Sequence, residues 1–354
     1  MPVDPSVRDG APGVRVVRMD AATDAARWDE YVGQRTGSVT DLFAWRHVVQ
    51  RAYGLRSHFF AAVDGSRIVG TLGLYEIAHP VFGHYLTTAV FGNDGGLHYD
   101  TEAARDALLA EGRRLTQGVN AGYLTIRSRT DSLDGSQNDD RYRTAMIALD
   151  GGAEVVWSRL PAKTRNQVRR GQKEGFTVST GPEQLDAFHE VFHHHMRDLG
   201  SPAHSHAFYE AVVEHLADRA EFVVVRDGRE LVGGALLFRL NGTATNYHTV
   251  ALSRFNRRCP NYLLYWAMIE SCCARGDRWF DMGRSMVDSS TLSFKENWNP
   301  AILQLHYNYF LARDARVPNL NPANPGFRLQ IAIWRRLPLF ITKQLGPRLI
   351  SGLA

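Results

Sequence analysis

The sequence predicts a mixed α/β fold, of the α+β kind, in which two tandem domains of one type are followed by a C-terminal helical tail. Segments 60–70 (FAAVDGSRIVG) and 222–233 (FVVVRDGRELVG) each contain an apolar strand, an Asp-Gly turn and a second apolar strand, which is the signature of a β-hairpin. Asp64 and Asp227 lie 163 positions apart, and so do Val69 and Val232. This constant offset predicts that one structural unit occurs twice.

The elements around the two hairpins also correspond. An amphipathic helix precedes each hairpin, at 43–54 (FAWRHVVQRAYG) and at 208–219 (FYEAVVEHLADR). A polar loop and a second helix follow each one, at 101–117 and at 261–275, and these lead to strands at 123–126 and 279–282. Because order and spacing both match, the pattern favours a domain duplication over the chance recurrence of a common hairpin.

These elements predict four regions. We expect a flexible leader at 1–14, an N-terminal domain at 15–150, a C-terminal domain with most of the chemistry at 151–316 and a helical tail at 317–354. The tail contains no acidic residue and five basic ones, namely Arg328, Arg335, Arg336, Lys343 and Arg348. Apolar and basic residues alternate there at helical spacing, which suits peripheral docking on an anionic inner membrane surface. It equally suits packing across the two domains.

The composition is that of a globular protein, with 44% hydrophobic and 22% charged residues among 354. No apolar run approaches the roughly 18 residues that span a bilayer, and an odd count of three cysteines favours a reducing cytosol. Subtracting the five tail charges from the net charge of +4 leaves −1 for the rest of the chain. A surface that binds anions must therefore be a local patch, and no DNA partner is expected.

His189 and His193 form a complete H-E-x-x-H motif, which on a helix is the signature of a zinc peptidase. The same segment also fits an amphipathic helix, because Leu185, Phe188, Phe192 and Met196 fall on one apolar face. We favour the helix interpretation, expect no metal and keep a zinc hydrolase as a minor alternative. His204 lies in the following loop, where we expect it to contact a ligand and not a metal, although a solvated side chain explains its position as well.

The second half carries motifs that resemble those of the FemAB family, which is built from tandem domains of the acyl-CoA N-acyltransferase (GNAT) fold. They are 163–170 (KTRNQVRR) with 174–178 (EGFTV), 280–285 (FDMGRS) and 292–298 (LSFKENW). In the first half, 91–97 (FGNDGGL) is similar to a glycine loop of that family. Segments 196–202 (MRDLGSP) and 256–266 (NRRCPNYLLYW) resemble a FemAB-related subgroup associated with exosortase and PEP-CTERM exopolysaccharide genes.

The resemblance covers roughly residues 15–312 and implies an N-acyltransferase that forms an amide on an amine of a cell-envelope or exopolysaccharide precursor. Acyl-CoA or aminoacyl-tRNA would be the co-substrate, and no tightly bound cofactor is implied. The implied partner is an anionic small molecule or a lipid-linked substrate, and tRNA stays open as a partner. Asn299 departs from the family pattern, which usually has glycine after the tryptophan. The alternative is a non-catalytic protein of this fold that binds or assembles components of exopolysaccharide export.

Three residues are the candidates for catalysis. Lys295 lies between aromatic residues, and a cation shielded from water stabilises a developing oxyanion strongly; the resemblance assigns this role to the matching lysine. Without the resemblance, a surface lysine between two buried aromatics explains the pattern as well. Asp281 and Arg284 either pair with each other or bind the ammonium and the carboxylate or phosphate of a substrate.

Several residues are candidates for substrate binding. The polar helix at 163–173 places like charges at i, i+4 spacing, which an anion such as a phosphate would relieve, although a solvated face explains it as well. A helix that opens at Pro260 offers free N–H groups as a second phosphate site. We expect one groove to hold Lys295 and the Arg165/Arg169 row together. The candidates are Lys163, Arg165 and Arg169 on the polar helix, Arg257 and Asn261 at the second site, Tyr247, His248, Tyr265 and His204 as contacts, and Trp45, Gly95 and Gly96 as cleft-lining residues of the first half.

Overall fold

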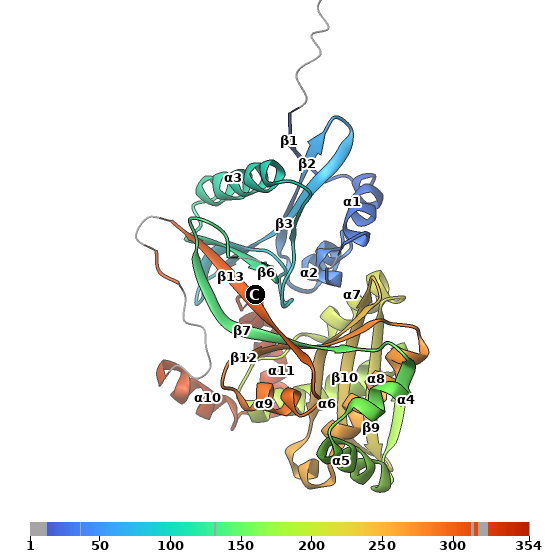
Figure 1. Ribbon diagram of the computed structural model, residues 1–354. Coiled ribbons are helices and arrows are strands. Elements are labelled where there is room, and N and C mark those ends of the chain that lie inside the picture. The colour runs from blue at the N-terminus through green and yellow to red at the C-terminus, as the bar shows by residue number, and fades with distance from the viewer. Residues whose placement is uncertain (1–12, 36, 131, 313–314, 318–324, 354) are drawn as a thin grey trace, which may run out of the picture.

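The computed structural model describes residues 13–35, 37–130, 132–312, 315–317 and 325–353, so nearly all of the leader expected at 1–14 lies outside the described residues (Figure 1). The first half contains β1 (Arg15–Arg18), α1 (Asp24–Gly33), α2 (Trp45–Tyr53), β2 (Arg56–Asp64), β3 (Arg67–His79), β4 (Gly83–Thr87), β5 (Leu97–Tyr99), α3 (Glu102–Gly118), β6 (Tyr123–Ser128) and β7 (Gln137–Ala148).

The second half begins with α4 (Gly152–Arg159), α5 (Ala162–Lys173), β8 (Thr177–Thr180), α6 (Leu185–Leu199), α7 (His206–Leu216), β9 (Ala220–Asp227), β10 (Glu230–Leu240) and β11 (Thr243–Ala251). It continues with α8 (Pro260–Ala274), β12 (Trp279–Met286), α9 (Ser290–Glu296) and β13 (Ala301–Leu311), and the tail contains α10 (Arg328–Trp334) and α11 (Leu339–Ile350). Within the described ranges, no helix is both long and apolar enough to traverse a bilayer.

The two halves repeat one order of elements, as the sequence predicts. In each half, antiparallel strands (β2, β3 and β4; β9, β10 and β11) lead into a long helix (α3; α8). That helix returns the chain to a strand that runs parallel to the last antiparallel one, so β6 pairs with β4 and β12 pairs with β11. The mixed α/β fold with a duplicated unit is therefore confirmed.

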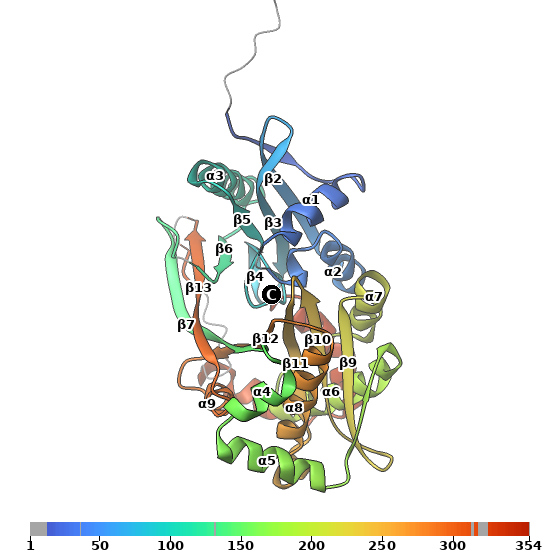
Figure 2. The ribbon, with the colours of Figure 1, turned by 45° about the vertical axis from the view of Figure 1, so that its right-hand side comes forward.

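The halves are joined by an exchange of strands at the centre of one continuous sheet. The strand order is β1-β2-β3-β4-β6-β13-β7-β12-β11-β10-β9-β8, with β5 paired to β3. Strand β13, from the end of the second half, lies between β6 and β7 of the first half, and β7 pairs in turn with β12 (Figure 2). Because each half contributes a strand to the other's side, the two halves cannot separate without breaking backbone hydrogen bonds.

Trp45 lies in the core that packs the two halves together. Its side chain is fully buried and donates a hydrogen bond from Nε1 to the carbonyl of Val90 at 3.1 Å. Its ring meets Phe208, Phe238 and Tyr247 of the second half edge-on. The expectation that Trp45 lines a substrate cleft is therefore wrong, because the neighbouring aromatic rings leave no space beside it.

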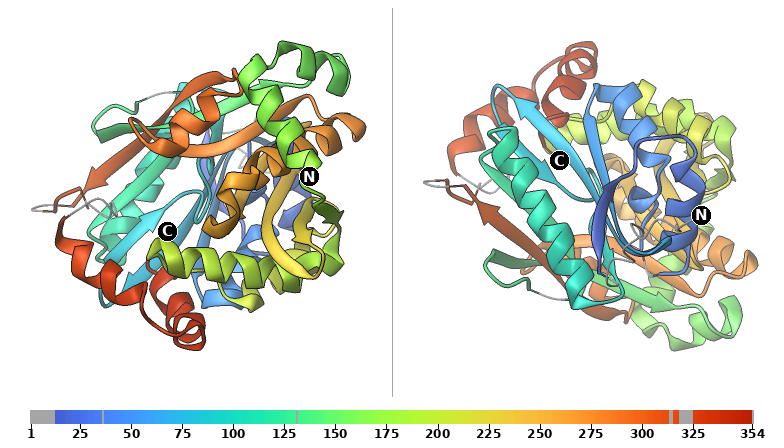
Figure 3. Two further views of the ribbon diagram at one scale, coloured as in Figure 1. Left: turned by 90° about the horizontal axis from the view of Figure 1, so that it is seen from below. Right: turned by 90° about the horizontal axis from the view of Figure 1, so that it is seen from above.

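The tail packs across both halves. Gly346 of α11 faces the backbone of Ala203, close enough that a Cβ would lie 3.2 Å from it. On the first half, the Tyr85 hydroxyl donates to the carbonyl of Gly352 at 2.9 Å. Figure 3 shows α10 and α11 at the periphery of the molecule, in red. The sequence left two alternatives for the tail, and one of them, packing across the two domains, thus occurs on the inner face of these helices.

The H-E-x-x-H motif lies on α6, and its histidines are packing residues. His193 is buried, and its Nε2 bonds the carbonyl of His204 at 3.1 Å, while the ring of His189 packs against that of His193 with centroids 4.4 Å apart. Burial lowers the pKa of His193 to about 4 and that of His189 to about 3. No group of three His, Cys, Asp or Glu side chains suited to a metal ion occurs in the described part of the chain.

We predict that this neutral histidine core makes the protein sensitive to mild acid. The folded pKa of His193 lies below the ordinary value of 6.5, so its stabilising contribution is complete above pH 6.5 and is lost as the pH falls towards 4. Urea unfolding should lose about 1.4 kcal/mol per pH unit for each such histidine in that interval. His193→Gln should reduce this slope, whereas His306→Gln, at a half-exposed position, should not. An unchanged slope in His193→Gln would contradict the prediction.

Candidate functional site

The two parallel strands β11 and β12 separate in the second half and form a wedge. They pair only from Thr243 opposite Trp279 to Thr245 opposite Asp281. Beyond this point β12 bends at Gly283, where φ is +80° and a Cβ would lie 2.7 Å from the carbonyl oxygen of Asn246. Only glycine fits this bend, because a side chain is strained at that φ and would also collide with β11.

Lys295 lies beneath this bend. Helix α9 begins at Ser289, whose hydroxyl caps the helix by accepting a hydrogen bond from the backbone N–H of Leu292. The Lys295 side chain is 3% exposed, and its Nζ donates to the carbonyls of Gly283 at 2.6 Å and Arg284 at 3.1 Å. An ammonium group has three N–H donors, so the two carbonyls leave one for a ligand.

The surroundings of Lys295 are aromatic. Phe294 and Trp298 on either side of it pack against Tyr262 and Tyr265 of α8. Burial lowers the pKa of Lys295 to about 8, although the nearby carboxylate of Asp281 opposes the shift. Near neutral pH the group is thus still mostly a cation, but one that is poorly solvated.

Asp281 is fully buried and holds the strands around the bend together. It accepts hydrogen bonds from Arg129 at 2.5 Å, from the Thr144 hydroxyl at 2.5 Å and from the backbone N–H of Gly283 at 2.8 Å. Arg129 also binds Asp94 through two hydrogen bonds of 2.5 and 3.1 Å. With every one of these donors engaged, Asp281 positions the site and is no free base.

Asp281 and Arg284 do not pair with each other, so the first of the two alternatives for these residues is wrong. Arg284 instead donates to the hydroxyl of Tyr307 at 2.6 Å and lies over the rings of Tyr307 and Tyr142. The carboxylate meets Arg129 because β12 pairs with β7, β7 with β13 and β13 with β6, and this order brings the end of β6 close. No pattern in the sequence signals this partner, since Arg129 and Asp281 are 152 positions apart.

The glycine loop of the first half reaches this cluster. Gly95 and Gly96 have φ values of +116° and +85°, and a Cβ would collide with the Asp41 carboxylate at Gly95 and with Thr88 at Gly96. The loop places Asp94 against Arg129 and accepts a hydrogen bond from Tyr307 at the carbonyl of Asn93, at 2.8 Å. The two glycines therefore shape the loop and do not line a cleft as expected.

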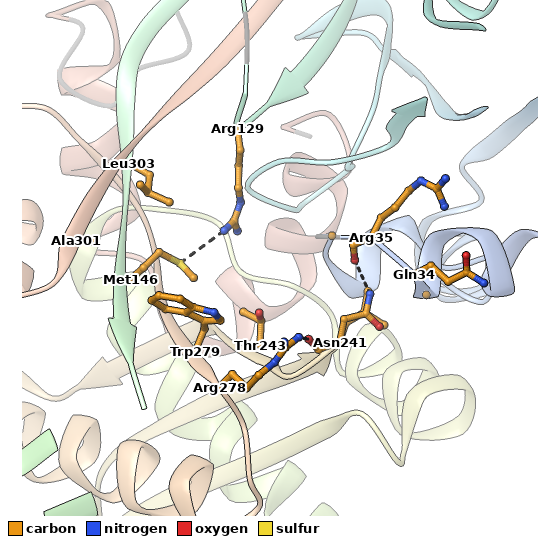
Figure 4. A pocket seen from close by; sticks show the side chains of 13 residues that line it. Gln34, Arg35, Arg129, Met146, Asn241, Thr243, Arg278, Trp279, Ala301 and Leu303 are labelled. Atoms are coloured by element: carbon orange, nitrogen blue, oxygen red, sulfur yellow. Dashed lines mark hydrogen bonds between the residues drawn. The ribbon is translucent and has the colours of Figure 1, made fainter. Parts of the chain in front are cut away.

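A cavity of about 630 Å³ opens between the halves beside the same cluster (Figure 4). Three arginines contribute to its wall: Arg35 from the end of α1, Arg129, and Arg278 before β12. No acidic residue occurs among its lining residues, but Arg129 is paired with Asp94 and Asp281 and Arg35 with Asp100, so Arg278 supplies the positive charge of the wall that has no ion-pair partner in the described part of the chain. Its other lining residues are Gly33, Gln34, Gly37, Met146, Leu240, Asn241, Thr243, Trp279, Ala301 and Leu303.

A second cavity of about 270 Å³ adjoins the first. The two share Met146, Trp279 and Ala301 as lining residues, and Trp298 and Asn299 line the smaller one alone. The backbone N–H of Trp298 donates to the carbonyl of Lys295 at 2.9 Å. The smaller cavity thus lies at the C-terminal end of α9, next to the cavity between the halves.

The basic helix α5 presents two faces. Thr164, Val168 and Gly171 are buried, and Gly171 packs on the backbone of Cys259 at the start of α8. Arg169 lies over the ring of Trp157 and lines a separate cavity of about 360 Å³.

Lys295 does not line that cavity, nor either of the two cavities described above. The single groove expected for Lys295 and the Arg165/Arg169 row stays a prediction. Lys163, Arg257 and Asn261 are at least partly exposed, Lys163 on α5 and the other two near the start of α8.

The remaining candidates belong to the second half, and His204 and Tyr247 also pack against the first half. His204 is buried and bonds the hydroxyl of Tyr53 through Nδ1 at 2.7 Å. Tyr265 accepts a hydrogen bond from Asn246 at 3.0 Å. Tyr247 and His248 pack against each other, and the Tyr247 hydroxyl and the His248 Nε2 are buried. Among these, only Tyr265 lies directly beside the aromatic shell of Lys295.

Residues 158–295 match the acetyltransferase (GNAT) domain family. A search of curated proteins found no match. Among solved structures, FemX aligns with a TM-score of 0.64 and 14% identity over 84% of this chain and 97% of its own.

Two further structures share the architecture. The C-terminal domain of a putative lysylphosphatidylglycerol synthetase from Agrobacterium fabrum aligns with a TM-score of 0.56 and 14% identity, over 83% of this chain and 93% of its own. A tandem GNAT protein from the clavulanic acid biosynthesis pathway aligns with a TM-score of 0.54 and 15% identity, over 85% and 100%. The chain is thus an acyltransferase with a GNAT domain in its second half, and it shares its fold with FemX and with the tandem GNAT protein.

Proposed function

We propose that the protein is an N-acyltransferase that forms an amide on an amine of a cell-envelope or exopolysaccharide precursor. One observation carries the proposal. The Lys295 ammonium is buried where β11 and β12 separate, and one of its N–H groups is left for a ligand. Burying a cation costs free energy, and a protein that only binds or assembles other components gains nothing from that cost at this position.

Lys295 would act on the oxyanion of the reaction. The acceptor amine, deprotonated, attacks the acyl carbon, and a tetrahedral intermediate with a negatively charged oxygen forms. The free N–H of Lys295 donates to that oxygen, and the interaction is strong because aromatic side chains keep water away. The amide forms when the bond to the donor breaks, and the released thiol or ribose hydroxyl takes up the proton lost by the amine.

The acceptor would bind in the cavity between the halves. Its volume lies within the range of about 300–1,000 Å³ that is common for ligand pockets. Arginines suit phosphate and carboxylate groups because the guanidinium makes two parallel hydrogen bonds. We infer that the anionic part of the precursor lies near Arg278, and that the amine points towards the smaller cavity beside Trp298.

The donor would be acyl-CoA or aminoacyl-tRNA, used on the cytoplasmic side of the membrane. Its phosphates would meet the start of α8, where Arg257 and Asn261 are accessible. On α5, Lys163, Gln167 and Arg170 share one face by helical spacing, and Gln167 contacts Cys259 at that start. The proposal thus assigns roles to three elements, β12 at the oxyanion and α8 and α5 at the donor phosphates. All three lie in the second half.

We predict that Lys295→Met lowers kcat by a factor of about 100 to 1,000, which is the usual effect of removing an oxyanion donor. The substrates are found first, by screening CoA thioesters and charged tRNAs with mass-spectrometric detection of amide products. Because the charged lysine acts, kcat should fall as the pH rises through about 8, and the falling limb should be absent in Lys295→Arg.

The control for Lys295 is Lys173→Met, an exposed lysine of α5 whose loss should leave turnover unchanged. Thermal unfolding of each variant separates a loss of fold from a loss of chemistry. Wild-type turnover in a folded Lys295→Met variant would refute the proposed role.

We predict that Arg278→Gln raises KM for the acceptor about tenfold, with a smaller effect on kcat, because a charge-assisted hydrogen bond to the acceptor is lost. Arg278 lines the cavity and is not part of the Asp281 cluster. Arg275→Gln is the matched control, since Arg275 is exposed three residues earlier and does not line the cavity. Equal KM values in the two variants would place the acceptor elsewhere.

A further inference from the structure

The outer face of the tail is apolar although its inner face is already packed. Leu329 and Ile333 of α10 are 70% and 51% exposed, and Phe340 and Leu345 of α11 are 66% and 40% exposed. Trp334 of α10 is buried instead. Four large apolar side chains in contact with water do not stabilise the fold. Their exposure therefore indicates a surface that binds a partner. We call it the tail surface.

Helical spacing places the apolar and basic residues together. Leu329 and Ile333 are four residues apart on α10, so they share a face, and Arg336 is exposed in the turn that follows the helix. On α11, Thr342 and Gly346 point inward, which leaves Phe340 and Lys343 on the outer side. Each helix thus presents large apolar side chains beside a cation, the arrangement of a helix that lies in a membrane interface.

Neighbouring segments extend the tail surface. Arg335 donates to the carbonyl of Leu199 at 3.1 Å, so the end of α6 adjoins α10, and the Leu199 side chain is also exposed. The turn between β3 and β4 meets the end of α11 at Gly352 and Phe82, and it exposes Val81. The apolar patch therefore spans both halves of the molecule.

The charges of the tail surface have no internal partner. None of the five basic residues of the tail takes part in an ion pair within the described part of the chain, and the tail sequence contains no acid to neutralise them. The cations of the tail, with no acid beside them in its sequence, repel those of a second copy, so a symmetric dimer through the tail surface is disfavoured. An anionic surface with an apolar layer beneath it matches both properties.

We propose that the tail surface docks the protein onto a bilayer that contains anionic lipid. Leu329, Ile333 and Phe340 would enter the interface, and Arg336 and Lys343 would meet the lipid phosphates. Lipid-linked acceptors lie at such a surface, but the docking does not depend on the proposed chemistry and is tested without it.

The test is co-sedimentation of the full chain with vesicles, of phosphatidylcholine alone and of phosphatidylcholine mixed with phosphatidylglycerol. We expect binding to the mixed vesicles at low salt, and weaker binding at high salt or without phosphatidylglycerol. The triple variant Leu329→Ser, Ile333→Ser, Phe340→Ser should lower the partition coefficient by at least about tenfold. Lys343→Gln with Arg336→Gln should weaken binding to the mixed vesicles alone.

The matched control is Val178→Ser, an exposed apolar residue of the edge strand β8, which should bind as the wild type does. Thermal unfolding shows whether each variant keeps its fold. The proposal is overturned if the wild type does not bind mixed vesicles at low salt, or if a folded triple variant binds equally well. It is also overturned if light scattering finds a wild-type dimer that the triple variant dissociates, since a second copy then covers the surface.

Discussion

The architecture depends on one partly buried arginine that two carboxylates share. Arg129 follows β6 of the first half, and it binds Asp94 from the glycine loop and Asp281 from β12 of the second half. Burial raises the pKa of Asp94, and Arg129 opposes that shift. Removing one member of such a group costs far more stability than the intact group provides, because a charge is left uncompensated. The cluster therefore fixes the distance between the halves, and with it the bend of β12 above Lys295.

The duplicated wedges have diverged. In the first half, β4 and β6 pair only at Leu86–Leu124 and Thr87–Thr125 and then separate, as β11 and β12 do. Arg127 fills this first wedge, where its guanidinium donates to the carbonyls of Ala89 at 3.2 Å and Gly92 at 2.7 Å. The second wedge holds a lysine with an N–H to spare. One wedge thus became a support for the interface, and the other kept the features that acyl transfer requires.

The interface between the halves also explains the unusual number of histidines. Tyr53 of α2 bonds His204, which stacks on Phe208, and His193 bonds the backbone of the same loop. A neutral imidazole packs like an aromatic ring while it still pairs one polar group, so it suits a mixed interface of this kind. The H-E-x-x-H spacing follows from the helical period, because residues four apart fall on one buried face of α6.

By itself, the sequence determined the elements and their repetition. Hairpins, amphipathic helices and the basic tail follow from local periodicity and turn residues. The motif between Asp281 and Trp298 predicted Lys295 as a candidate for catalysis. Tertiary structure alone decided that β13 lies between β6 and β7, that Arg129 and not Arg284 pairs with Asp281, and that Arg169 lines a cavity that Lys295 does not line. These are contacts through space between segments far apart in the chain. Local pattern contains no information about them, because strand partners and buried charge pairs are chosen by the packing of the whole sheet.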